Sequence, residues 1–426
     1  MITEARPVNY RGLMKKVEQV VAAMDRAEDI GTTIHTIVET IIVKFHDELG
    51  IYGGRLYQRR GDSYVLQTVV GDAKKEVPRG LKVPVSYRPI QIVLEQGAVF
   101  MEADDPRIDR SFEQLIGVQQ FAAIEVGDEE YILAFDVAPG VNGDDILFSL
   151  GILRHSINQK IRRERMEGIF AQARKIQASI LPRRAPDYGQ FDFAGRSDPM
   201  EEVGGDFFDF IPVTEKILGL AIADVSGHGL PAALQVRDIY MGLRMGLARD
   251  FKIVRTVERM NSIIHKSTLT SRFVSMFYGE LELNGVFIYV NAGHPPPYHI
   301  AANGMVRSME EGGPVLGPLP ETSYERGFVI MKPGDMLVFY TDGICETHGR
   351  DGEGEPEEEY GVDRMLRVAR EHQGRSSQEV ADAIFASVEA FSGGAPADDD
   401  RTVMVVTYPV IDKTNQTRAF PRPLGV

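Results

Sequence analysis

The feature that most limits how this 426-residue chain can fold is a set of short acidic motifs lying beside runs of β-prone residues. Asp224 follows LGLAIA, Asp342 follows DMLVFYT, and Asp399 lies just before RTVMVVTY. Carboxylates at strand ends can converge at one end of a β-sandwich, where a cation relieves their mutual repulsion. Hard oxygen ligands suit Mg²⁺ or Mn²⁺ better than zinc. The pattern therefore predicts a β-rich domain that holds a divalent metal centre.

The composition argues against several other classes of protein. A formal net charge of −15 disfavours nucleic acid or an anionic membrane as the main partner, because phosphate groups are bound by clustered Lys and Arg. No stretch approaches the roughly 20 apolar residues of a membrane span, and the opening MITEARPVNYRG lacks the apolar core of a signal peptide, so we expect a cytoplasmic protein. The single cysteine, Cys345, excludes an internal disulfide framework and is expected to be a packed thiol.

The N-terminal third predicts an α+β domain. Residues 28–49 repeat apolar side chains at the helical period, and short β-prone runs separated by turn residues follow, among them YVLQTVVG and YILAFDV. This order resembles a GAF-type sensory domain over roughly residues 25–160. The resemblance implies a sensory domain at residues 1–145, with an antiparallel sheet and a pocket for a small-molecule or protein signal. An α+β dimerisation module that binds no ligand is the alternative.

A long amphipathic helix is predicted between the domains, at residues 146–182. Its apolar stripe consists of Leu150, Leu153, Ile157, Ile161, Ile169, Ala173, Ile176 and Ile180. Because neither flanking domain obviously supplies a surface along the whole stripe, we expect the same helix of a second subunit to cover it, giving a homodimer. Ile157 and Ile161 would then be interface residues, and Gln177 and Ile180 would pass the signal to the next domain.

Five motifs follow in order: EVGGDFFDF, IADVSGHGLPAAL, NAGHPPPY, FYTDGICET and ADDDRTVMVV. Each alone is most often a turn. Together, over about residues 170–410, they resemble the PPM phosphatases, specifically the bacterial branch of sporulation stage II E and stress-response sigma regulators. The resemblance implies an αββα sandwich at residues 183–410, followed by a tail at 411–426. It also implies two Mn²⁺ or Mg²⁺ ions and hydrolysis of phosphoserine or phosphothreonine by a water that bridges them, on a STAS-type anti-sigma-factor antagonist.

The resemblance also assigns roles to the acidic residues. Asp224 is expected to bridge both metals, and the carbonyl of Val225 to bind the first. Asp342 and Asp399 are expected to complete the second site, with Asp206 in or next to the first. Asp398 and Asp400 are expected to be acidic neighbours only.

Other residues of the motifs are expected to shape the loops around the metals. The glycines among them are Gly204, Gly205, Gly227, Gly229 and Gly343, which let the backbone approach the ions. His228 and His294 are expected to hold the loops, with an acid or metal-ligand role as the alternative. Asp209 is expected to be a supporting carboxylate. Ser275 stands where the family customarily has Thr.

Two competing functions have to be weighed. A catalytically inert sensor that docks signalling partners is disfavoured because all four aspartates are present. A kinase or nucleotide cyclase would need a Gly-rich or Lys-bearing phosphate loop, and EVGGDFFDF resembles the GGDEF signature only superficially.

Overall fold

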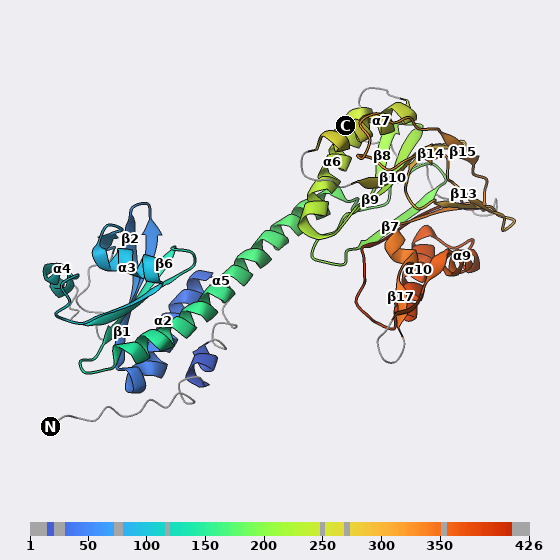
Figure 1. The fold of residues 1–426 in the computed structure, drawn as a ribbon. Coiled ribbons are helices and arrows are strands. Elements are labelled where there is room, and N and C mark those ends of the chain that lie inside the picture. The colour runs from blue at the N-terminus through green and yellow to red at the C-terminus, as the bar shows by residue number, and fades with distance from the viewer. Residues whose placement is uncertain are drawn as a thin grey trace. The chain divides into compact units, whose positions relative to one another are not determined.

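The computed structural model describes residues 15–20, 30–71, 80–115, 120–247, 252–267, 273–350 and 356–410. The chain divides into two compact units, Met1–Ile169 and Phe170–Val426, and the division falls inside helix α5 (Gly143–Ile180) (Figure 1). The predicted tail at 411–426 lies outside the described residues. Among the described residues, no helix has the length and apolar character needed to span a membrane.

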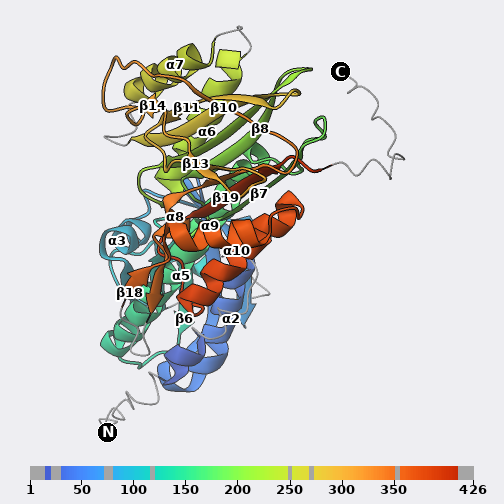
Figure 2. The ribbon, with the colours of Figure 1, turned by 90° about the vertical axis from the view of Figure 1, so that its right-hand side faces the viewer.

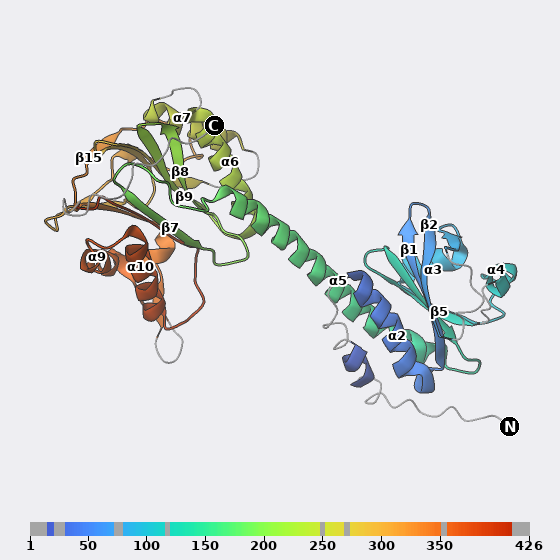
Figure 3. The ribbon, with the colours of Figure 1, turned by 180° about the vertical axis from the view of Figure 1, so that it is seen from behind.

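The first unit is built on an antiparallel sheet of six strands in the order β3-β2-β1-β6-β5-β4. Its strands are β1 (Ile51–Arg60), β2 (Ser63–Gly71), β3 (Lys82–Pro84), β4 (Ala98–Met101), β5 (Phe121–Val126) and β6 (Tyr131–Val137). Helices α2 (Ile30–Leu49) and α5 lie on one face, whereas α3 (Arg88–Gln96) and α4 (Arg110–Leu115) lie on the other (Figure 3). Strands β5 and β6 are buried along their whole length because both faces are covered.

The first half of the helical stripe is buried inside this unit. Leu150, Leu153, Ile157 and Ile161 are fully buried and share a core with α2 and the sheet. The expectation that neither flanking domain covers them is therefore wrong. Strands β5 and β6 carry apolar side chains on both faces, so the sheet needs a second helix beside α2, and α5 supplies it.

The second half of the stripe lies on another face of α5. Ile169 and Ile176 are each more than half exposed, as is Met166, which was not part of the predicted stripe, and Ala173 is partly exposed. Ile180, the last residue of the stripe, is partly buried and packs on the core beneath α6 and α7. At about 100° per residue, the 16 residues from Leu153 to Ile169 turn the helix by roughly 160° beyond whole turns. The single stripe drawn from the sequence is thus two stripes on different faces of the helix.

The second unit consists of two packed sheets with helices on both outer faces (Figure 2). One sheet holds β8 (Asp206–Thr214), β9 (Ile217–Val225), β10 (Val274–Glu282), β11 (Val286–Ala292), β14 (Gly312–Gly313) and β15 (Gly327–Ile330). The other holds β7 (Asp192–Asp198), β12 (Tyr298–Ile300), β13 (Val306–Ser308), β16 (Met336–Tyr340) and β19 (Arg401–Thr407). A hairpin of β17 (His348–Arg350) and β18 (Pro356–Glu359) stands apart from both sheets.

Three apolar layers hold this sandwich together. Helices α6 (Gly229–Leu247) and α7 (Ile253–Lys266) pack on the first sheet, the two sheets pack on each other through an aromatic-rich interior, and α9 (Gly361–Glu371) and α10 (Ser377–Ser392) pack on the second sheet. The strands alternate between these layers, as the period of two requires. This is the αββα arrangement that the sequence resemblance implies.

Candidate metal centre

Two of the predicted aspartates face each other across neighbouring strands. Asp206 begins β8, Asp224 lies next to the last residue of β9, and the two are direct antiparallel partners. On the other side of β9, Asp224 is the partner of Ser275 in β10. Like charges placed directly opposite each other destabilise a sheet, so this pair of carboxylates has a cost that the fold alone does not explain.

Asp206 is buried and held by two threonines. Its Oδ2 accepts hydrogen bonds from the Thr341 hydroxyl at 2.8 Å and from the Thr402 hydroxyl at 2.6 Å. Burial, followed by repulsion from Asp224, raises the pKa of the Asp206 carboxyl well above its usual range. Thr341 follows the end of β16 and Thr402 lies at the start of β19, both in the sheet that does not contain Asp206. The Asp206 carboxylate therefore joins the two sheets. Sequence reasoning missed both, although Thr341 directly precedes Asp342.

The remaining predicted carboxylates repel the charged form of Asp224. Burial, then Asp342 and Asp399, raise the pKa of Asp224 to about 7. Burial and Asp399 raise the pKa of Asp342, which begins the short helix α8 (Asp342–Cys345). Glu346, which sequence reasoning did not single out, has its pKa raised by burial and by Asp342. The structure thus brings the four predicted aspartates into one region of strong negative potential.

The backbone next to Asp206 packs closely against two carbonyl groups. A Cβ on Gly205 would lie 2.8 Å from the carbonyl oxygen of Val225 and 3.2 Å from that of Gly227. The Val225 N–H also donates to the Gly205 carbonyl at 3.2 Å. A larger residue at position 205 would collide with the Val225 carbonyl, so glycine is required here by close approach. Gly227 and Gly229 adopt φ of 85° and 73° in the loop that leads into α6.

Asp400 holds the loop that precedes Asp206. Its carboxylate accepts from the backbone N–H of Met200 at 2.7 Å and of Gly205 at 2.6 Å. It is 3% exposed, whereas its neighbour Asp399 is exposed. The expectation that Asp400 is only an acidic neighbour is therefore wrong. These contacts span about 200 positions in the sequence, which is why the DDD run did not reveal them.

His294 is buried and forms hydrogen bonds with residues of both sheets. Its Nε2 lies 3.1 Å from the Tyr340 carbonyl, which can only accept, so Nε2 carries the proton and Nδ1 accepts from the Ser275 hydroxyl at 2.8 Å. Burial lowers the pKa of His294 to about 3. A neutral imidazole with both nitrogens occupied holds structure and has no free lone pair for a metal or a proton.

The other supporting residues lie at the edges of this region. His228 is exposed, and its Nδ1 lies 2.7 Å from Glu201 Oε1, which joins two loops. Asp209 is buried on β8 and pairs with Arg244 of α6 at 2.9 Å. Burial raises the pKa of Asp209, and Arg244 opposes that shift. Gly343 packs so closely on the Asp400 carbonyl that a side chain would overlap it.

The residues present fit a hard divalent cation. Within the described ranges, no three His, Cys, Asp or Glu side chains already stand in a ready-made metal-binding arrangement. The donors are nevertheless carboxylate and carbonyl oxygens, Gly205 lets the backbone come close to two of the carbonyls, and the aspartates repel one another without a counter-charge. Such a set suits Mg²⁺ or Mn²⁺.

Comparisons with known proteins agree with this arrangement. Residues 214–409 match the family model described as Stage II sporulation protein E. Protein IcfG of Synechocystis is 24% identical over 67% of this chain and 49% of its own length. Phosphoserine phosphatase RsbU of Bacillus subtilis is 27% identical over 51% of this chain and 63% of its own length. The chain therefore spans about half to two thirds of the length of these relatives.

A solved structure shows the same fold. The SiaA-PP2C domain of Pseudomonas aeruginosa superposes with a TM-score of 0.51 at 18% identity, covering 58% of this chain and 98% of its own. Residues 214–409 of the second unit are therefore a SpoIIE-type domain, and the unit has a PP2C-like fold.

Proposed function

We propose that the chain is a metal-dependent serine/threonine protein phosphatase that hydrolyses phosphoserine or phosphothreonine, with a STAS-type anti-sigma-factor antagonist as its substrate. One observation carries the proposal: buried, mutually repelling aspartates from separate motifs are gathered at the strand ends of a PP2C-type sandwich. The similarity to the phosphoserine phosphatase RsbU supports the substrate class.

The ligand roles are proposed as follows. Asp224 and the Val225 carbonyl would hold one Mn²⁺ or Mg²⁺ ion, with Asp206 beside it, and Asp224, Asp342 and Asp399 would hold the second. When bound, such ions neutralise charge on the phosphoryl oxygens and lower the pKa of the attacking water. The chain's own contribution is to hold these oxygens in place and to keep the phosphate site free of competing side chains.

The supporting side chains each have a defined task in this proposal. Thr341 and Thr402 orient the Asp206 carboxylate, and Asp400 fixes the loop before it. Cys345 is not a nucleophile, because burial raises the pKa of its thiol to about 12 and so leaves no thiolate at neutral pH.

The first unit is proposed to be a GAF-like sensory domain that regulates the phosphatase through α5. Within that unit, the β5–β6 turn is held by α5: Arg162 and Arg165 both pair with Asp128, and Asn158 accepts from the Gly127 N–H at 2.7 Å. Within the second unit, Gln177 of α5 binds the Gly204 backbone in both directions, at 2.7 and 3.3 Å. A shift of α5 would therefore move the loop that carries Gly205 and Asp206.

A homodimer through α5 remains part of this proposal, with a different contact surface. Met166, Ile169, Ala173 and Ile176 are spaced by three, four and three residues, which is the a/d pattern of a coiled coil. Their exposure supports this segment as the contact with a second copy, in place of Ile157 and Ile161.

Hydrolysis of p-nitrophenyl phosphate with and without Mn²⁺ tests the catalytic proposal. We expect turnover that depends on added metal and disappears with a chelator. A phosphorylated STAS-domain protein then tests the substrate class, with a phosphotyrosine peptide as the control. An inert sensor would hydrolyse none of these at any metal concentration.

A further inference from the structure

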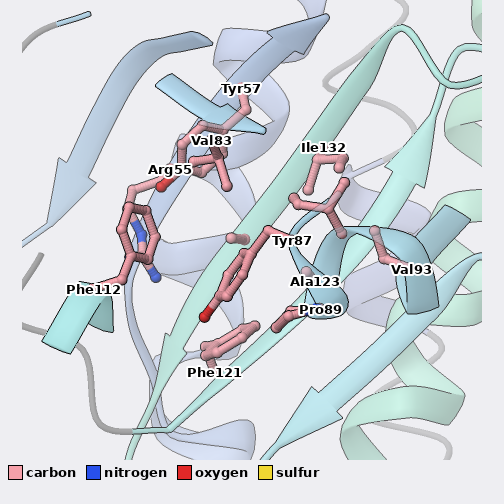
Figure 4. A pocket seen from close by; sticks show the side chains of 12 residues that line it. Arg55, Tyr57, Val83, Tyr87, Pro89, Val93, Phe112, Phe121, Ala123 and Ile132 are labelled. Atoms are coloured by element: carbon pink, nitrogen blue, oxygen red, sulfur yellow. The ribbon is translucent and has the colours of Figure 1, made fainter. Parts of the chain in front are cut away.

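A hollow lies in the first unit on the face of the sheet opposite α2 and α5. It measures about 430 Å³ when the part open to solvent is counted, and it lies between the sheet, α3 and α4 (Figure 4). The floor is formed by strand residues that include Arg55, Ala123 and Ala134, and two alanines at its centre leave the space open. Aromatic rings surround it, among them Tyr57, Tyr87, Phe112 and Phe121.

A buried arginine forms part of the floor. Arg55 is 1% exposed, and its Nη2 lies 2.5 Å from Asp136 Oδ1. The chain makes room for this pair, because a Cβ on Gly53 would come within 2.5 Å of Asp136 Oδ2. The glycine at position 53 therefore allows the Arg55–Asp136 ion pair to lie on the surface of the sheet.

One donor of Arg55 is left without a partner. Its Nε is buried and forms no hydrogen bond with the protein. A buried N–H without an acceptor is costly, and in native proteins such a group usually meets a water or a ligand. Arg55 is one of the residues that line the hollow, so the unpartnered N–H belongs to its wall.

The charges of Arg55 and Asp136 determine whether a charged or an uncharged acceptor is favoured in the hollow. Asp136 balances the charge of Arg55, and among the described residues that line the hollow Arg55 is the only charged one. An anionic ligand would add a third, uncompensated charge to a buried pair, which is unfavourable. An uncharged acceptor satisfies Nε without that cost.

The roof is held more lightly than the floor. Tyr87 and Phe112 are partly exposed and meet edge to face at 5.3 Å, and the Tyr87 hydroxyl accepts from the Asp109 N–H at 3.2 Å. The floor, in contrast, consists of paired strands. The enclosed part holds only a few waters, so a ring-sized molecule enters when the two rings move outward.

We propose that this pocket binds a small, flat, uncharged aromatic molecule whose carbonyl or ring nitrogen accepts a hydrogen bond from Arg55 Nε. The inference rests on the proposed sensory role of the first unit and gives that role a ligand class. Such a ligand would press on β5 and β6, whose connecting turn is the one held by α5.

Three monocyclic probes of similar size separate the contribution of the hydrogen-bond acceptor from the effect of ligand charge. Binding of each is measured by ligand-observed NMR on the full chain. Acetophenone carries a carbonyl, ethylbenzene lacks an acceptor, and benzoate carries a charge. We expect acetophenone to bind at millimolar concentration, with benzoate and ethylbenzene each weaker by about tenfold. Arg55→Lys keeps the charge beside Asp136 but removes Nε, so it should weaken acetophenone by about tenfold and ethylbenzene little. Arg60→Lys, an exposed site on the same strand, should change neither.

Filling the hollow gives an independent test. Ala134→Leu should abolish acetophenone binding, and Ala123→Leu serves the same purpose if the first variant fails to fold. Absence of acetophenone binding to the wild type, equal binding by Arg55→Lys, or retained binding by a folded pocket-filling variant would overturn the proposal. Hydrolysis of p-nitrophenyl phosphate by the same samples is a separate readout, so an inactive protein that still binds acetophenone refutes the phosphatase and leaves the pocket standing.

Discussion

Gln177, near the end of α5, forms two hydrogen bonds with the backbone of Gly204, two residues before Asp206. The side-chain Nε2 donates to the Gly204 carbonyl at 2.7 Å, and Oε1 accepts from the Gly204 N–H at 3.3 Å. Asp400 holds the next residue, Gly205, from the other side. The position of Asp206 is therefore set jointly by a helix that begins in the first unit and a strand end of the second.

Gln177→Glu should raise the metal concentration needed for half-maximal hydrolysis. The substitution replaces the donor with an oxygen that faces the Gly204 carbonyl, which loses one hydrogen bond and adds repulsion, about 1–2 kcal/mol. Metal titrations of p-nitrophenyl phosphate hydrolysis measure the effect. Gln172→Glu, an exposed position on the same helix, is the matched control and should leave the titration unchanged. Identical metal titrations for Gln177→Glu and wild type would contradict the proposed role.

Asp224→Asn should abolish metal-dependent hydrolysis and stabilise the metal-free protein at pH 8. The folded-state pKa of Asp224 is raised to about 7, so its contribution to stability is present below its unfolded pKa of about 4 and is lost as the pH rises through 7. Removing the charge should recover up to about 4 kcal/mol at pH 8. Thermal melts at pH 5 and pH 8 with a chelator check this. Turnover above a tenth of wild type at saturating Mn²⁺ would refute the ligand role.

The acidic residues could be located from the sequence because strand ends have a local signature, whereas the order of the layers was implied only by the family resemblance. A β-prone run followed by an aspartate can be recognised without knowing what pairs with it, as at Asp224 and Asp342. The partners of these groups could not be found in this way. Thr402 reaches Asp206 across 196 positions and Arg55 reaches Asp136 across 81, and both contacts depend on which strands become neighbours.

The stripe on α5 shows a second limit. Spacings of three, four and eight were treated as one face, but a gap of eight residues advances the helix by about 80° beyond two turns. The error accumulates between Ile161 and Ile169, where the burial changes from complete to about half. The periodicity correctly indicated a helix. Adding up the rotation of about 100° per residue along the stripe would have shown that the helix has two apolar faces.

His294 should remain neutral in the folded protein down to pH 4. Burial lowers its pKa to about 3, so the unfolded chain takes up a proton near pH 6.5 that the folded chain does not, and stability is lost as the pH falls below 6.5. The loss from this residue is about 3 kcal/mol at pH 4. Histidine-selective NMR would follow its protonation. A titration near pH 6 would show that the ring is exposed and would reopen a role in acid catalysis.

Cys345→Ser should retain hydrolysis of p-nitrophenyl phosphate within about twofold, because the buried thiol has no place in the proposed chemistry. Turnover and the thermal melt should be measured together. An inactive variant with an unchanged melt, or a trapped phosphoenzyme, would indicate a covalent route through the thiol.

Ile169→Glu should separate a dimer, whereas Ile157→Glu should unfold the first unit, and the difference between them tests which face of α5 meets a second copy. Ile169 is 54% exposed, so a carboxylate there costs the isolated chain little and removes only an intermolecular contact. Ile157 is fully buried between α2 and the sheet, where an unpaired charge is not tolerated.

Sedimentation at tens of micromolar should give a dimer for the wild type and a folded monomer for Ile169→Glu. Val43→Glu, an exposed apolar site on α2, is the matched control and should remain dimeric. A wild-type monomer at that concentration would refute the dimer. A dimeric Ile169→Glu variant would instead place the contact elsewhere.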